Sequence, residues 1–211
     1  MIMLSLNHIS YIHPDKTPLF TDVSFALNTR EKIALIGNNG SGKSTLLKIV
    51  AGELLPSSGV VRTDTKPYYV PQIFGQFDHL TIAEALRIDK KLFALNEILN
   101  GNASEEHFDT LQDDWTLEER CREALNYWHL QDLDLHQKLN TLSGGQKTKV
   151  FLAGIAIGQW EFVLLDEPSN HLDIASRKLL YDFIQSASVT LLVVSHDRKL
   201  LNLLDRVAEL D

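Results

Sequence analysis

The chain has 211 residues, of which 44% are hydrophobic and 23% are charged, a composition typical of one globular domain with a sizeable core. Its formal net charge of −8 provides no overall positive field that would attract DNA or anionic lipid. One cysteine excludes an intramolecular disulfide framework, no stretch reaches the roughly 20 apolar residues that cross a bilayer, and the start lacks signal-peptide features. These observations predict a soluble domain of the cytoplasm, which would also suit a cytosolic subunit of a membrane complex.

The first seventy residues predict several short strands and one helix. Residues 3–9 and 23–27 alternate apolar and polar side chains, as half-buried strands do. Residues 32–36 are a short apolar run that enters a glycine-rich turn, and a helical pattern follows over 43–50, with Gly52 as its expected end. Further strands are expected at 60–62 and 68–70, and Pro71 would end the second of these.

The glycine-rich turn reads GNNGSGKST and matches G-x-x-x-x-G-K-[ST] between a predicted strand and a predicted helix. Glycines let backbone N–H groups approach phosphate oxygens, and the helix N-terminus adds partial positive charge. Lys43 would reach the β- and γ-phosphates, and the Ser44 hydroxyl would ligate Mg²⁺. The residues predicted to bind a nucleoside triphosphate are Gly37, Asn38, Asn39, Gly40, Ser41, Gly42, Lys43, Ser44 and Thr45.

The middle of the chain, from about Thr81 to Tyr127, has a mostly helical and polar pattern with a break near residues 100–102. Residues 101–124 hold eight acids against Arg120 and Arg122, which accounts for −6 of the net charge. The simplest interpretation of this run is a solvated helical face.

Two adjacent carboxylates follow a fully apolar strand predicted at 162–165. A buried parallel strand delivers its last residues to the carboxyl edge of the sheet, where open α/β proteins bind ligands. Asp166 is suited to hold Mg²⁺ through its water shell, and Glu167 to address a water beside the γ-phosphate. Two surface acids at a strand end are the alternative, which the nearby phosphate loop disfavours, so hydrolysis is predicted. A helix at 174–186 and an apolar strand at 189–194 complete an alternation typical of a parallel sheet covered on both faces.

Residues 142–146 read LSGGQ, in which Ser143 is placed to cap a helix and two glycines permit close approach. With the phosphate loop and the LLDE strand, in this order over essentially the whole chain, the motif resembles the nucleotide-binding domain of ATP-binding-cassette (ABC) proteins. The resemblance implies an α/β fold: a P-loop NTPase core with a mainly parallel sheet, an N-terminal antiparallel β subdomain, and a helical subdomain at about 81–141. It implies ATP and Mg²⁺ as cofactors.

The family pairs two cassettes head to tail, so a second cassette is the implied partner, from the same longer chain or a homodimer. Each LSGGQ then closes over the ATP held by the other cassette. The residues this assigns to the partner's nucleotide are Ser143, Gly144, Gly145 and Gln146.

Other family positions are matched singly. Gln72 resembles the glutamine that senses Mg²⁺ and the attacking water, although a polar residue after a strand-ending proline is the plainer alternative. His196 resembles the histidine that contacts the γ-phosphate, where a structural histidine is the alternative. Asp173 resembles the aspartate that communicates across the dimer. His13 stands where the family usually stacks an aromatic ring on adenine, and Tyr11 is either a substitute or a core residue.

The run Asn170-His171-Leu172-Asp173, with Ser-His-Asp-Arg at 195–198, resembles the ABC-F branch of the family. Members of that branch carry two cassettes, lack a transmembrane partner and act on ribosomes in translation or antibiotic protection. The chain is therefore expected to be the first cassette of a longer protein. The acidic segment, which is a poor match for RNA phosphates, would contact a basic ribosomal protein or nothing. The alternatives are the ATPase subunit of a membrane transporter and a nucleotide-gated interaction module without hydrolysis; an intact Glu167 argues against the latter.

Overall fold

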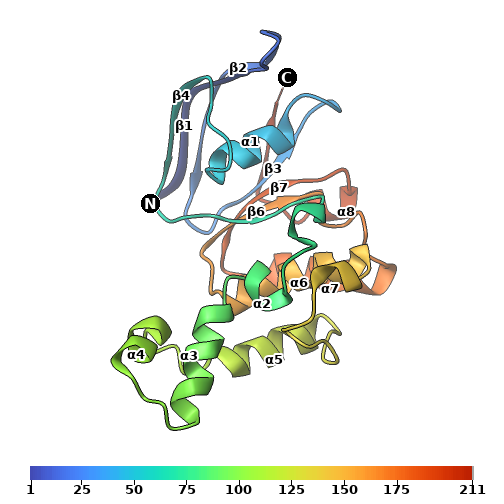
Figure 1. Ribbon diagram of the computed structural model, residues 1–211. Coiled ribbons are helices and arrows are strands. Elements are labelled where there is room, and N and C mark those ends of the chain that lie inside the picture. Colours follow the sequence, from blue (N-terminus) through green and yellow to red (C-terminus); the bar gives the residue numbers. More distant parts are fainter. Residues whose placement is uncertain (211) are drawn as a thin grey trace. The chain divides into compact units, whose positions relative to one another are not determined.

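The computed structural model describes residues 1–210, which form two compact units: Met1–Gln72 together with the part from Trp160 onward, and Ile73–Gln159. The first unit is built on two β-sheets and the second on helices (Figure 1). The helical unit contains the region expected to be helical, and the two units have separate hydrophobic clusters.

One sheet of the first unit is antiparallel and three-stranded, with β1 (Ile2–Ile12) between β2 (Pro18–Asn28) and β4 (Ser58–Thr63). All three strands are longer than the ranges predicted for them, 3–9, 23–27 and 60–62. The β1–β2 register shifts between Ile9 and Tyr11 and again between Tyr11 and Ile12, and Asp22 of β2 has a left-handed φ of 60°. Such irregularities interrupt the two-residue period, which is why the alternation marked β1 only as far as Ile9 and β2 only from Val23.

The other sheet is parallel and five-stranded, in the order β5 (Tyr68–Val70), β6 (Phe162–Asp166), β7 (Thr190–Val194), β3 (Lys32–Ile36), β8 (Arg206–Glu209). Every residue of β6 and β7 is buried, as their continuous apolar runs predicted. The antiparallel and the parallel sheet confirm the predicted fold class. The sequence patterns missed β8 and the short helix α8 (Arg198–Leu201).

The two longer helices of the first unit are α1 (Lys43–Val50) and α7 (Ile174–Ser186), both with the predicted bounds. Leu46 and Leu47 of α1 are fully buried in one core cluster with Leu4 and Leu6 of β1. Figure 1 shows α1 beside the strands of the antiparallel sheet. The chain leaves α1 through Gly52, whose φ of 75° suits glycine and confirms it as the helix stop.

The helical unit contains α2 (Ile82–Ala85), α3 (Asp89–Leu99), α4 (Glu105–Leu111), α5 (Leu117–Tyr127) and α6 (Gly144–Ile157), with single 3₁₀ turns at Gly75–Phe77 and Leu139–Thr141. The predicted break at 100–102 separates α3 from α4. Among residues 1–210, no helix combines the length and the apolar character that a membrane crossing requires.

Candidate nucleotide-binding site

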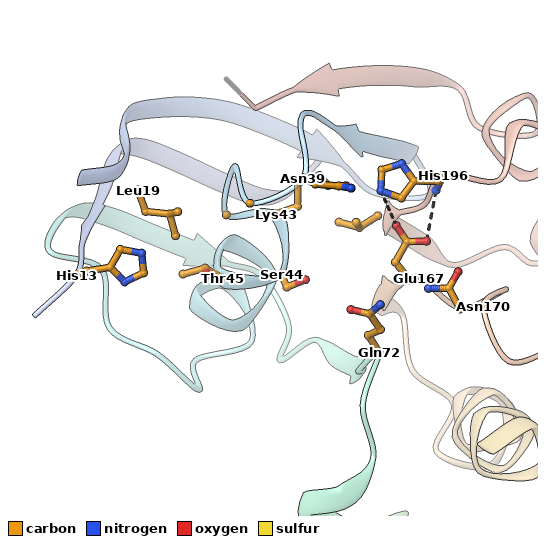
Figure 2. A pocket seen from close by; sticks show the side chains of 13 residues that line it. His13, Leu19, Asn39, Lys43, Ser44, Thr45, Gln72, Glu167, Asn170 and His196 are labelled. Atoms are coloured by element: carbon orange, nitrogen blue, oxygen red, sulfur yellow. Dashed lines mark hydrogen bonds and ion pairs between the residues drawn. The ribbon is translucent and has the colours of Figure 1, made fainter. Parts of the chain in front are cut away.

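A cavity of about 620 Å³ opens in the first unit, where the parallel strands end (Figure 2). The phosphate loop follows β3, Gln72 follows β5, Glu167 follows β6, and Val194 ends β7. Carboxyl ends of parallel strands share one sheet edge, which explains how segments far apart in sequence meet there. The cavity is lined by His13, Leu19, Asn39, Gly40, Gly42, Lys43, Ser44, Thr45, Gln72, Glu167, Asn170, Val194 and His196.

The phosphate loop has a backbone that depends on glycine at two of its positions. Gly37 has φ 151°, and a Cβ there would lie 2.2 Å from the Leu210 carbonyl oxygen. Gly42, the N-cap of α1, has φ 95°, and its Cβ would lie 2.7–2.9 Å from the Phe20 and Leu19 side chains. A Cβ at Gly37 would clash with backbone, and the left-handed φ of Gly42 would strain any other residue, so both positions favour glycine.

The loop's polar groups are arranged for an anion. Lys43 is 8% exposed, and its Nζ donates to the Gly37 and Asn38 carbonyl oxygens at 2.9 and 2.8 Å. The buried Ser41 hydroxyl has no hydrogen-bond partner within the described residues. A phosphate would meet an ammonium whose present partners are neutral carbonyls, at the N-terminus of α1. This chemistry fits the predicted ligand.

Asp166 is buried at the end of β6 and accepts two side-chain hydrogen bonds. Ser44 Oγ donates to its Oδ1 and Tyr69 OH donates to its Oδ2, both at 3.1 Å. Burial raises the pKa of the Asp166 carboxyl, and these two bonds oppose that rise. Burial, and then the Asp166 charge, raise the pKa of the Tyr69 hydroxyl, so Tyr69 stays protonated as the donor.

These groups also fit Mg²⁺, because a carboxylate, a hydroxyl and an amide are hard oxygen donors. Asp166 and Ser44 lie together, and Gln72 lines the same cavity. In the described part of the chain, no three or more His, Cys, Asp or Glu side chains are grouped to hold a metal on their own. A magnesium ion here would therefore rely on one carboxylate, the Ser44 hydroxyl and oxygens of the nucleotide, as is common for Mg²⁺.

Glu167 and His196 lie side by side in the cavity lining and form a pair (Figure 2). His196 Nε2 lies 3.4 Å from Glu167 Oε1, and the His196 backbone N–H donates to Oε2 at 3.3 Å. The Glu167 side chain is 7% exposed, whereas that of His196 is 61% exposed. Burial raises the pKa of the Glu167 carboxyl, and His196 opposes the rise. Glu167 also has φ 50°, a left-handed conformation uncommon outside glycine, so its backbone already departs from the strand that Asp166 ends.

The two residues predicted as candidates to stack on adenine, His13 and Tyr11, have different positions in the structure. His13 lines the cavity beside Leu19, which sequence reasoning did not select (Figure 2). Tyr11 is half-buried against the core cluster, with its ring 6.3 Å from Phe20 and edge-on to His13 at 5.6 Å. Of the two alternatives for Tyr11, the structure favours a core residue that supports His13.

Asn170 is a polar cavity residue that the sequence patterns did not assign to the nucleotide site. Its backbone N–H donates to the Glu167 carbonyl at 3.2 Å, so the tight turn after β6 brings its side chain near Glu167 and Gln72 (Figure 2). Asp173 does not line the cavity. It is the N-cap of α7, where Oδ1 accepts from the Ser176 N–H at 2.7 Å.

The LSGGQ motif lies in the helical unit, at the start of α6. Ser143 is the N-cap, as predicted: Gln146 N–H donates to Ser143 Oγ at 3.3 Å, and Ser143 N–H donates to Gln146 Oε1 at 3.0 Å. This reciprocal pair is a capping box, which orders the helix N-terminus and leaves Gly144 and Gly145 in the first turn.

The fold and the cavity define a P-loop domain built to bind a nucleotide. The chain belongs to the ABC transporter family, whose family description matches residues 20–170. A similar solved structure is a dimeric, post-hydrolysis ATP-binding cassette bound to ADP and Pi, with a TM-score of 0.74 and 24% identity over 99% of this chain and 94% of that one. The fold and family are those of the ABC ATPases.

Three relatives represent different uses of this domain. An antibiotic resistance protein of Mycobacteroides abscessus is 32% identical over 96% of this chain and 40% of its own length. ABC transporter F family member 4 of Arabidopsis thaliana is 29% identical over 95% of this chain and 26% of its length. The zinc import ATP-binding protein ZnuC of Acinetobacter baylyi is 30% identical over 89% of this chain and 65% of its length. The chain thus spans well under half of the first two proteins.

Proposed function

We propose that this cassette binds ATP with Mg²⁺ and hydrolyses it, with Glu167 activating the water. The observation that carries the proposal is the placement of Glu167, buried and paired with His196, in the same cavity as Lys43 and Ser44. A protein that only bound nucleotide would have no need of a carboxylate there in addition to Asp166.

Binding begins at the phosphate loop. The β- and γ-phosphates of ATP take over Lys43 Nζ from the Gly37 and Asn38 carbonyls, because an anionic oxygen accepts a stronger hydrogen bond from an ammonium than a carbonyl does. When bound with ATP, Mg²⁺ neutralises negative charge on the β- and γ-phosphate oxygens. Ser44, Asp166 and Gln72 would hold it, and Tyr69 and Ser44 keep the Asp166 carboxylate oriented.

Hydrolysis then needs an oriented water. A Glu167 oxygen accepts a proton from water as the water oxygen attacks the γ-phosphorus, and the bond to the oxygen shared with the β-phosphate breaks to release ADP and phosphate. The raised pKa of Glu167 makes it a stronger base than an exposed glutamate. His196, exposed on the cavity side, exchanges its contact with Glu167 for the γ-phosphate and holds that group during the attack.

The proposed active unit contains two cassettes. Ser143, Gly144, Gly145 and Gln146 of each cassette close over the ATP of the other, because a capped, glycine-bearing helix N-terminus is a ready anion site. Asp173 communicates across that interface. The dimeric cassette structure with the same fold supports this arrangement, as does the span of this chain, which is 40% of the Mycobacteroides relative.

The biological setting proposed is that of the ABC-F branch, in the cytoplasm and on the ribosome, in translation or antibiotic protection. The Asn-His-Leu-Asp run at 170–173 and the resemblance to an F family member and an antibiotic resistance protein support it. The ATP-binding subunit of a membrane transporter is the alternative, and the resemblance to a zinc import protein supports that one.

The test uses the full-length protein with Glu167→Gln and the matching change in its second cassette. We expect ATP binding to persist and turnover to fall about 10²- to 10⁴-fold, since the base is removed but the phosphate loop is intact. The ATP-bound variant should co-sediment with ribosomes, whereas the same variant carrying Lys43→Ala should not. Wild-type turnover by Glu167→Gln would refute the assignment of the base, and recovery of the trapped protein with membranes would favour the transporter alternative.

A further inference from the structure

A second cavity, of about 690 Å³, lies entirely within the helical unit. Leu92 of α3 and Leu125 of α5 line it and are each 5% exposed, and half-buried Leu133 and Leu135 from the segment after α5 line it too. Cys121 completes this apolar lining, because burial raises the pKa of its thiol to about 11 and keeps it neutral. The cavity therefore offers an apolar floor of side chains from three segments.

The rim of the same cavity is acidic. Glu118 and Glu119, in the first turn of α5, and Asp134, after that helix, are exposed and line it. The one rim arginine, Arg122, lies 3.7 Å from Glu119, and both side chains are mostly exposed. An apolar floor beneath three carboxylates suits a ligand in which an apolar side chain is flanked by positively charged groups.

The charge of the whole chain is concentrated around this cavity. Residues 101–136 contain ten acids and two arginines, and the remaining 175 residues contain 18 acids and 18 lysines or arginines. Of the two arginines, Arg120 is already paired with Asp114 at 2.7 Å. All of the excess negative charge thus lies in the 36 residues that bear the rim.

Exposed aromatic rings extend the apolar surface beyond the cavity itself. Trp115 lines the cavity and is 46% exposed, and Phe108 of α4 is 42% exposed with its ring edge-on to Trp115 at 6.1 Å. Partly exposed tryptophan is over-represented among the anchors of protein interfaces. The acids of α5 and the aromatic rings of Phe108 and Trp115 together match an extended ligand better than a compact one.

We propose that this surface, which we call the α5 groove, binds a basic amphipathic segment of a protein partner. An apolar side chain of the segment enters the cavity beside Trp115, and its lysines or arginines lie against Glu118, Glu119 and Asp134. RNA is the wrong ligand, because its phosphates would face these carboxylates. The α5 groove lies wholly in the helical unit, so this binding does not depend on ATP hydrolysis.

The experiment titrates the whole chain with a helical peptide of about 14 lysines and leucines, the leucines along one face. Tryptophan fluorescence and calorimetry report binding. The same composition in scrambled order tests the apolar face, a glutamate–leucine peptide tests the charge, and a single-stranded RNA oligomer tests the other class of partner.

Two matched double variants locate the site. Glu118→Gln with Glu119→Gln removes two rim charges, and Glu105→Gln with Glu106→Gln removes two adjacent charges from the first turn of α4, outside the cavity lining. We expect the rim pair to weaken binding of the basic peptide about tenfold and the α4 pair less than twofold. Trp115→Ala should weaken it by about tenfold, and Trp115→Phe by less.

Equal effects of the two pairs would overturn the proposal in favour of a diffuse acidic field. It would likewise fail if the scrambled peptide or the RNA bound as tightly as the amphipathic peptide. Circular dichroism of each variant checks folding. The ATP affinity of the rim variant should be unchanged, so that a loss of peptide binding is distinguished from a failure of the proposed ATPase site.

Discussion

Tyr69→Phe removes a single hydroxyl from β5 and keeps a ring of the same shape. In the wild type, that hydroxyl donates to Asp166 Oδ2 while Ser44 donates to Oδ1, so the carboxylate is held from both sides. A hydrogen bond to a charged group contributes roughly 1.5–3 kcal/mol, or about ten- to 150-fold in an equilibrium constant. Because Ser44 remains, we expect the lower end: the Mg²⁺ concentration for half-maximal effect rises about tenfold.

The assay measures binding of a fluorescent ATP analogue while Mg²⁺ is titrated, which needs no turnover. Without Mg²⁺, the variant should bind the analogue within about twofold of the wild type, because Lys43 and the phosphate loop are untouched. Turnover should recover most of its wild-type value at saturating Mg²⁺.

Tyr68→Phe is the matched control, since it removes the neighbouring hydroxyl from the same strand. The ring of Tyr68 stacks on Trp160 at 5.2 Å rather than facing the cavity, so its Mg²⁺ titration should match the wild type. A role of Tyr69 in holding Asp166 for Mg²⁺ is refuted if Tyr69→Phe and the wild type have the same Mg²⁺ midpoint. It is also refuted if ATP binding without Mg²⁺ falls by the same factor as binding with it.

Two other changes test the phosphate loop and the helical unit. Lys43→Ala should weaken ATP binding at least about 100-fold in equilibrium dialysis. Lys48 is exposed on the same helix, and Lys48→Ala should not weaken binding. Tight ATP binding by Lys43→Ala would contradict the assignment of the phosphate loop. Asp114 accepts from Arg120 and Lys91, and these bonds hold its pKa below the ordinary value, so Asp114→Asn should lower the free energy of unfolding by about 2 kcal/mol at neutral pH. Because the folded-state pKa is depressed, this stabilisation is present above the unfolded-state pKa of about 3.9 and is lost as the pH falls through the folded-state value. Urea unfolding of variant and wild type should therefore converge in acid, and a gap independent of pH would be inconsistent with the ion pair.

Sequence patterns were most accurate for the elements whose bounds are set by residues close by in the sequence. The bounds of α1, α7, β3 and β5 were predicted to the residue, because each is set by its own apolar period and by a nearby Gly, Pro or cap. The phosphate loop and Ser143 belong to the same group. Both were located from motifs a few residues long, although the loop's surroundings include distant residues such as Leu210.

The elements and contacts that sequence reasoning missed depend on distant partners. β8 is a four-residue, mostly exposed strand, and it exists because Arg206 to Glu209 pair with Ile33 to Ile36. Tyr69 matters through Asp166, 97 residues later, and Leu19 enters the cavity from an antiparallel strand. The place of Asn170 could have been predicted from the sequence. It lies three residues after Glu167, and a tight turn there would have indicated that it lines the cavity.

The position of β3 has a consequence for the order in which the protein forms during synthesis. The strand that carries the phosphate loop lies between β7 and β8, and Leu210 donates its N–H to Ile36 and places its carbonyl against Gly37. The antiparallel sheet uses only residues 2–63, so its partners are all made early. The loop, although translated before residue 50, lacks both neighbouring strands until residues 190–210 have emerged. The growing chain therefore acquires its nucleotide site only after residues 190–210 have emerged, and ATP binding reports that β7 and β8 have paired with β3.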